Sequence, residues 1–344
     1  MLRDWAVRVL YVSLSGGLLI PAARGEDVAA LTQRLQAADA GSALDSADMK
    51  PWHLKMTVQL FDDKGNASDH GTIEEWWNGA GADRREYATT GYTATEIRQG
   101  RDLYRTQGAN TPPYYLDLLR AQIVHPMPKP AEVQSASPEL RKVNFGKFAL
   151  ECVMLSQPMK QVMIPMGLFP SYCFDPGKEV LRASFELGEQ TILRNTLEEF
   201  GSKVVPQDVS VRSEKTEVAK GEMVTLESVS IPDSEFVPAT NVVAQTGSIA
   251  RVSGGAMAGS LISKPAPVYP ASAKANHASG AVILHAVIGT DGHIHSLALV
   301  STPDPDLAIS AIAAVRNWTY KPYMLQGVPV DVDTTITVKY TFGP

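Results

Sequence analysis

The chain contains, at residues 280–301, the stretch GAVILHAVIGTDGHIHSLALVS. Its Asp291-Gly292 pair is a strong signal for a two-residue hairpin loop, because both central positions of the tight turn need a positive φ angle. Strands 281–289 and 293–301 would then run antiparallel, with Ile288 opposite His295. Their apolar residues fall on one side, namely Val282, Leu284, Ala286, Leu297 and Leu299. The stretch therefore predicts a β-hairpin with one buried face.

A short helix and a third strand are expected after this hairpin. Asp304 suits the N-cap of a helix, and Pro305 suits its first position. The apolar residues of this helix recur at helical spacing, at Leu307, Ala311, Ile312 and Val315. Alternate residues from Val330 to Tyr340 are apolar or threonine, as in a half-buried strand. We expect residues 281–301 and 328–342 to form one antiparallel sheet, with the helix 305–317 on a single face.

The order of residues in this region resembles the C-terminal domain of the energy transducer TonB. The positions that carry the resemblance are Pro267, Tyr269, Pro270, Ala273, Gly280, Asp291, Gly292, Leu307, Ala311, Val315, Trp318, Tyr320, Pro322, Gly327, Pro329 and Val330. That family couples inner-membrane energy to outer-membrane receptors. The resemblance implies a small sheet-and-helix binding module over residues 261–344, with helices on one face of a three-stranded sheet.

The resemblance also implies a partner and a binding strand. In that family the partner is a short extended segment near the N-terminus of an outer-membrane receptor, and it pairs with the late C-terminal strand. Such pairing uses the unpaired N–H and C=O groups of a sheet edge. The corresponding peptide-binding residues here are Val332, Asp333, Thr334, Thr335, Ile336, Thr337 and Val338. From residue 261 onward the chain carries five Lys or Arg, five Asp and no Glu, so contacts rather than long-range attraction should govern binding.

The region before residue 238 has the spacing of an antiparallel β domain. Residues 52–60 alternate between apolar and polar, as in a half-buried strand, and residues 114–124 have helical spacing, as do residues 26–48. Further strands are expected at 71–77, 84–87, 92–98, 102–106, 147–156, 180–186, 191–200 and 223–231. The pattern resembles the half-barrel of LolA/LppX lipoprotein carriers, in which a curved sheet faces a helix across an apolar cavity. Another antiparallel β domain is the alternative, and the resemblance implies a hydrophobic ligand.

Cys152 and Cys173 are the two cysteines of the chain. Each lies in a strand-like run, and Pro and Gly separate the two runs. An exported chain with one possible pairing favours a structural disulfide, while two unbridged buried thiols are the alternative.

The beginning of the chain has the pattern of an export signal. Arg3 and Arg8 precede an apolar stretch, 9–20, and Ala23 and Gly25 then offer small residues at cleavage positions. We expect a signal peptide at 1–25, a LolA-like β domain at 26–238, a Gly/Ser/Ala linker at 239–260 and the TonB-like domain at 261–344. The protein is then expected in the periplasm, and an uncleaved inner-membrane anchor is the alternative.

Two features depart from the TonB pattern. The N-terminal apolar stretch lacks the His that the family's anchor carries for its motor partners, and no long Pro-rich spacer crosses from it to the C-terminal module. These departures argue against coupling to an inner-membrane motor.

Several other functions find no support in the residues. The net charge of −6 and the absence of a basic run argue against a nucleic-acid partner. His285 has the opposite strand parity to His293 and His295, so no metal site is expected. Glu74 and Glu75 are adjacent in a strand and face opposite sides, which excludes a carboxylate pair. No enzyme motif or cofactor fingerprint is present, so we expect a binding protein without a cofactor.

Overall fold

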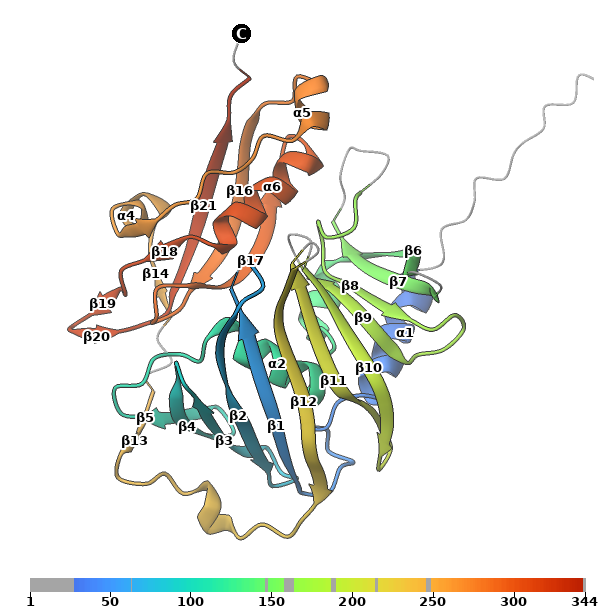
Figure 1. The fold of residues 1–344 in the computed structure, drawn as a ribbon, viewed down its shortest axis with the longest axis vertical. Coiled ribbons are helices and arrows are strands. Elements are labelled where there is room, and N and C mark those ends of the chain that lie inside the picture. The colour runs from blue at the N-terminus through green and yellow to red at the C-terminus, as the bar shows by residue number, and fades with distance from the viewer. Residues whose placement is uncertain are drawn as a thin grey trace, which may run out of the picture.

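A computed structural model describes residues 28–62, 64–145, 148–157, 164–186, 190–213, 216–245 and 249–342. The expected signal peptide, 1–25, lies outside the described residues. Within those residues, no helix is long and apolar enough to cross a membrane. A large sheet with its helices forms the first unit, and a smaller sheet with its helices forms the second (Figure 1).

The large sheet has 13 strands, and every neighbouring pair is antiparallel. Its strands are β1 (Trp52–Phe61), β2 (Ala67–Trp77), β3 (Ala82–Thr89), β4 (Thr93–Gln99), β5 (Asp102–Thr106), β6 (Ser137–Phe145), β7 (Phe148–Ser156), β8 (Ser171–Phe174), β9 (Leu181–Glu186), β10 (Gln190–Phe200), β11 (Lys203–Ser213), β12 (Thr216–Ser228) and β13 (Val242–Ala244). Their order is β13-β5-β4-β3-β2-β1-β12-β11-β10-β9-β8-β7-β6. The first strand therefore lies beside the twelfth. β6 and β11 were not predicted, and Pro206 interrupts the strand pattern of β11.

Helix α2 (Tyr114–Val124) lies on the concave side of this sheet, with the bounds that the sequence predicts. Its Leu116, Leu119 and Ile123 are fully buried against strands on both sides of β1. In Figure 1 the sheet bends around this helix. Helix α1 (Val28–Ala40) packs its apolar side over the strands at the β6 end, and α3 (Pro130–Ser135) and the 3-10 turn η1 (Asp233–Phe236) are short. The prediction of a curved antiparallel sheet with a helix on its concave side is confirmed.

A ladder of alternating charges connects α2 to the sheet. Glu75, Arg85, Glu96 and Arg105 are direct cross-strand neighbours on β2 to β5, and all four are buried. Arg105 Nε lies 2.7 Å from Glu96 Oε1, and Arg85 Nη1 lies 3.7 Å from Glu96 Oε2. At the other end, both carboxylate oxygens of Glu75 accept hydrogen bonds of 2.6 Å from Arg120 of α2. The pairing makes a buried charge tolerable and fixes the helix in register with the sheet.

Cys152 and Cys173 form a disulfide, as predicted. They are direct partners in the β7–β8 pair, and both are fully buried.

The second unit contains a four-stranded sheet in the order β14-β21-β16-β17. Its strands are β14 (Ala250–Arg251), β16 (Gly280–Ile288), β17 (Ile294–Ser301) and β21 (Val332–Tyr340). The central strand β16 is antiparallel to both neighbours, while β14 is parallel to β21. Helix α6 (Pro305–Arg316) buries its predicted apolar stripe on one face of the sheet, and Asp304 accepts N-cap bonds from Asp306 N and Leu307 N. The predicted hairpin, tail strand and single-face helix are confirmed, and the parallel fourth strand is new.

Short elements complete the unit. They are α4 (Gly254–Ala258), α5 (Ala271–Ala275), the pair β15 (Leu261–Ser263) and β18 (Thr319–Tyr320), and the hairpin β19 (Met324–Leu325) and β20 (Val328–Pro329). Residues expected to form a linker, 239–260, thus contribute β13 to the 13-stranded sheet, β14 to the four-stranded sheet, and the single helical turn α4.

The predicted register of the β16–β17 hairpin is wrong at its tip. Ile288 lies opposite Ile294, not His295, and Gly289 N donates to His293 O across a three-residue loop. Gly292 has φ +78°, the left-handed conformation that adds a bulge residue to such a loop. The register then shifts by one residue at His295, because Val287 lies opposite Ser296, so the apolar residues of both strands still share one face.

Adjacent glutamates on β2 provide a matched test of the charge ladder. Replacing Glu75 with Gln removes the anion that buried Arg120 contacts at 2.6 Å, and should lower the free energy of unfolding by about 3–5 kcal/mol, although Arg85 keeps Asp83 at 2.9 Å. Replacing Glu74 with Gln should cost less than about 1 kcal/mol, because Glu74 lies on the other face with His53 and Lys55, where water screens the pair. Urea unfolding measures both values, and equal losses would contradict the assignment.

His125 should make stability depend on pH. It follows α2, and its ring lies 3.1 Å from Asp39 and 2.6 Å from Asp45. Hydrogen bonds to Asp39 and Asp45 raise the pKa of His125 to about 10, above its usual value of about 6.5. The charged pair therefore stabilises the fold fully below pH ~6.5, and this contribution is lost as the pH rises toward ~10. His125→Gln should unfold more easily than wild type at pH 6, and the difference should shrink by pH 10; a constant difference would refute the assignment.

Candidate functional site

The predicted peptide-binding residues lie on β21, and the strand sorts them by parity. Side chains of Val332, Thr334, Ile336 and Val338 are buried toward α6, whereas Thr335 and Thr337 are exposed and Asp333 is half-buried. One set thus belongs to the core. The other set leaves a narrow polar strip on the opposite face of the sheet.

The main-chain N–H and C=O groups of β21 alternate between its two neighbours, β14 and β16. Ala250 N donates to Asp331 O at 2.8 Å, and Val252 N donates to Asp333 O at 3.0 Å. Because main-chain groups alternate along a strand, Thr335 and Thr337 direct theirs to this outer edge as well. The remaining residues direct theirs to β16.

Part of this edge is already occupied. β14 pairs with Val332 and Asp333, and the hydroxyl of Thr334 donates to Val252 O at 2.7 Å. Beyond β14, helix α4 begins against Thr335: a Cβ atom on Gly254 would lie 2.0 Å from Thr335 O. The edge expected to be open is therefore covered from Asp331 to Thr335. This cover was not predicted, because residues 239–260 have no hydrophobic periodicity.

Two histidines near the site, His285 and His295, have a carboxylate partner. His285 Nε2 lies 3.0 Å from Asp333, and His295 Nε2 lies 3.0 Å from Asp291. Burial alone would raise the pKa of Asp291, but the hydrogen bond and charge of His295 outweigh it and lower that pKa. Across the described part of the chain, no three His, Cys, Asp or Glu side chains are grouped to hold a metal.

The residues that carry the TonB resemblance serve the framework around β21. Trp318 is buried, and its Nε1 donates to Pro265 O at 3.0 Å, so this ring belongs to the core. The Tyr269 ring meets the Tyr340 ring edge-on at 5.4 Å. Gly292 lies so close to β18 that a Cβ atom would be 2.0 Å from Tyr320 O.

The remaining glycines and prolines of this set lie at turns and strand ends. Gly280 and Gly327 have positive φ angles of 134° and 84°. Pro270 precedes α5 as its N-cap, Pro322 follows β18, and Pro329 ends β20. Among the described residues, no recorded interaction joins these glycines and prolines to the outer edge of β21.

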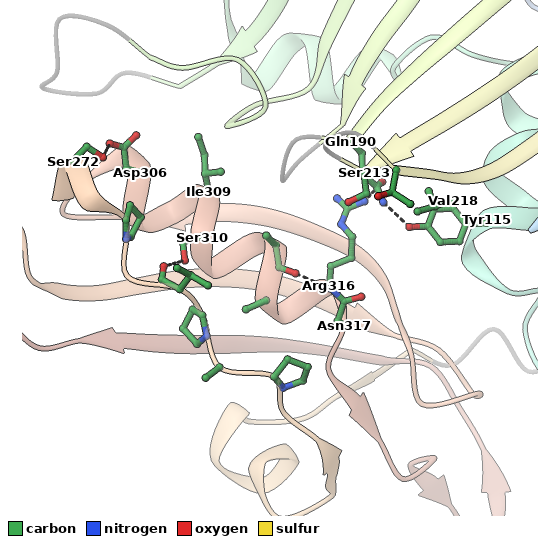
Figure 2. A pocket seen from close by; sticks show the side chains of 18 of the residues that line it. Tyr115, Gln190, Ser213, Val218, Ser272, Asp306, Ile309, Ser310, Arg316 and Asn317 are labelled. Carbon is green, nitrogen blue, oxygen red and sulfur yellow. Dashed lines mark hydrogen bonds between the residues drawn. The ribbon is translucent and has the colours of Figure 1, made fainter. Parts of the chain in front are cut away.

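A second candidate site lies where the two units meet (Figure 2). There a cavity of about 790 Å³ separates the rim of the large sheet from α6. Phe61 and Val218 line the side of the cavity formed by the large sheet, and Ile309 and Ala313 line the side formed by α6. Arg316 of α6 donates to Gln190 Oε1 and, at 3.3 Å, to the hydroxyl of Tyr114. This cavity was not predictable from local patterns, because its lining residues are far apart along the chain.

Structural comparison finds solved proteins that resemble the first unit. A LolA superfamily protein from Nitrosomonas europaea has a TM-score of 0.40 and 11% identity, and the match covers 60% of this chain and 97% of that chain. A putative outer membrane lipoprotein-sorting protein domain from Vibrio parahaemolyticus has a TM-score of 0.38 and 10% identity, with coverage of 60% and 94%. No curated protein matched the sequence.

The second unit matches a family model. Residues 265–342 match the model described as Gram-negative bacterial TonB protein C-terminal. This range contains β16, β17, α6 and β21, and it contains every residue on which the predicted resemblance depends. The C-terminal module of this chain thus carries the domain of the TonB C-terminal family.

Proposed function

We propose that this protein acts in the periplasm and binds an extended segment of an outer-membrane partner through the outer edge of β21. One observation carries the proposal: this edge accepts a parallel strand, because Asp331 O and Asp333 O take hydrogen bonds from the main chain of β14. The match to the TonB C-terminal family supports a receptor-type partner. The role assigned is binding in support of transport across the envelope, without catalysis and without an inner-membrane motor.

The contact should depend on main-chain pairing more than on side chains. Thr335 and Thr337 are exposed and small, and the module has five Lys or Arg against five Asp. A partner strand would gain its affinity from N–H and C=O groups in register, with side chains adding selectivity.

A proline on the open part of the edge tests this proposal. Thr337→Pro removes one outward N–H and places a ring on the edge, yet leaves the bonds to β16 intact. We expect binding of synthetic peptides from the periplasmic N-terminal segments of outer-membrane receptors to weaken about tenfold or more, since roughly 1.4 kcal/mol is one decade in affinity.

Thr337→Ala is the matched control, because alanine keeps the N–H group. It should bind the same peptides as wild type in titration calorimetry. If the proline variant binds as tightly as the alanine variant, pairing at this edge is wrong.

A second candidate function is that of a carrier for a lipid or another hydrophobic ligand. The cavity at the sheet rim favours it, because that cavity lies beside the start of α2 and has apolar residues on both sides. The second unit would then dock the loaded carrier to its membrane partner.

Extraction of the native protein tests the carrier function. The protein is purified from the envelope fraction without detergent, extracted with organic solvent and analysed by mass spectrometry. A carrier should yield about one lipid per chain after extensive washing. Protein free of lipid that also fails to take up a fluorescent fatty acid would contradict this candidate.

A further inference from the structure

The outer edge of β21 already holds a segment of the same chain, which we call the strap and define as residues 250–258. The strap comprises β14, the N-cap Ser253 and the single turn α4. Its main-chain N–H groups donate hydrogen bonds to the carbonyls of Asp331 and Asp333, and its Gly254 lies against the carbonyl of Thr335. These are main-chain groups that a partner strand would need.

The strap is held by few side chains. Met257 is 2% exposed and inserts into the core of the C-terminal module, and Val252 packs partly against the same core. The other residues of the strap are largely exposed, and β14 contributes only two paired residues. A short attachment of this kind can open locally while the sheet behind it stays folded.

The uncovered part of the edge is too short for a partner. Beyond Thr335, the outward main-chain groups of β21 belong to Thr337 and Lys339. A strand that pairs with two residues alone would gain little affinity. A partner of ordinary strand length must therefore use the carbonyls that β14 holds.

From this geometry we infer that the strap is an intramolecular occupant of the partner-binding edge, and that a partner strand binds by displacing it. The inference rests on the proposed function and adds its regulation. The strap also indicates the partner's form: a segment that runs parallel to β21 and carries an aliphatic side chain at the place of Val252. Since the partner meets only the open population, the strap lowers the apparent affinity by the fraction of molecules in which it is released.

Two neighbouring glycines provide the test. A Cβ atom on Gly254 would lie 2.0 Å from Thr335 O, whereas a Cβ atom on Gly255 has nothing within 4 Å. Gly254→Ala should therefore lift the strap from β21, and Gly255→Ala should leave it in place. Both changes add the same methyl group to adjacent positions of one helical turn, so helix propensity is matched.

The probe is the strap itself, added as a synthetic peptide of residues 249–257, IARVSGGAM. We expect Gly254→Ala to bind this peptide about tenfold tighter than wild type, as release of a mostly closed state requires, while Gly255→Ala binds like wild type. Amide hydrogen exchange at Ala250 and Val252, whose N–H groups donate to β21, should become faster in Gly254→Ala alone. Equal binding by wild type and Gly254→Ala, or equal gains in both variants, would overturn the inference.

A reversible disulfide between the strap and β21 provides a second test, in case the glycine variant fails to fold. Arg251 and Asp333 are direct partners in the parallel pair, so Arg251→Cys with Asp333→Cys can bridge the strap to β21. The oxidised form should bind neither the strap peptide nor receptor peptides, and reduction of the same variant should restore measurable binding of both. Wild type under the same treatment controls for the buried Cys152–Cys173 bond. Binding by the locked form would overturn the inference.

The two proposals fail differently. If Gly254→Ala gains affinity for the strap peptide but binds no receptor-derived peptide, the outer-membrane partner is wrong and the displaceable strap stands. If receptor peptides bind wild type and the locked form equally, the edge is not their site and the strap does not regulate it.

Discussion

Main-chain groups at the edge of a β-sheet need partners, and two such edges here are covered by one short stretch of chain. β13 pairs with β5 at one edge of the large sheet, and six residues later β14 pairs with β21 at one edge of the small sheet. An uncovered edge invites pairing with other chains. The stretch that joins the two units therefore also protects both of them, which a structureless linker would not do.

The large sheet achieves its shape through a different constraint. Because β1 pairs with both β2 and β12, strands from the two ends of the first unit lie side by side and curve around α2. The concave side carries charged residues as well as apolar ones. The charge ladder from Arg105 to Arg120 crosses four strands and ends on the helix. Such a ladder selects one register, since a shift by one residue would turn every charge to the other face.

Much of this fold was predictable from local patterns. The alternation in 52–60, the spacing in 114–124 and the Asp-Gly turn each depend on neighbouring residues, and each predicted the correct element. The hairpin register was not predictable in the same way, because it depends on a three-residue loop and on a one-residue shift at His295. Glu75 and Arg85 are separated by a turn whose length sets their pairing, so the ladder becomes visible only with the strand register. The strap was missed for another reason: Gly, Ala and Ser over 253–260 are typical of a linker, and only the proximity of Gly254 to Thr335 shows why a glycine is required there.

Asp331 brings these elements together at one residue. Its carbonyl accepts from the strap at Ala250, while its carboxylate accepts from Thr290 N at the hairpin tip and from the hydroxyl of Thr111, which precedes α2. Thr111 N in turn donates to the hydroxyl of Thr290 at 2.8 Å. The start of the candidate binding edge is therefore built from both units, so a strand that binds at this edge pairs beside the contact that joins them. The placement of the first unit and the occupancy of the edge share the same few hydrogen bonds, which is why the site is a property of the whole chain and not of the C-terminal module alone.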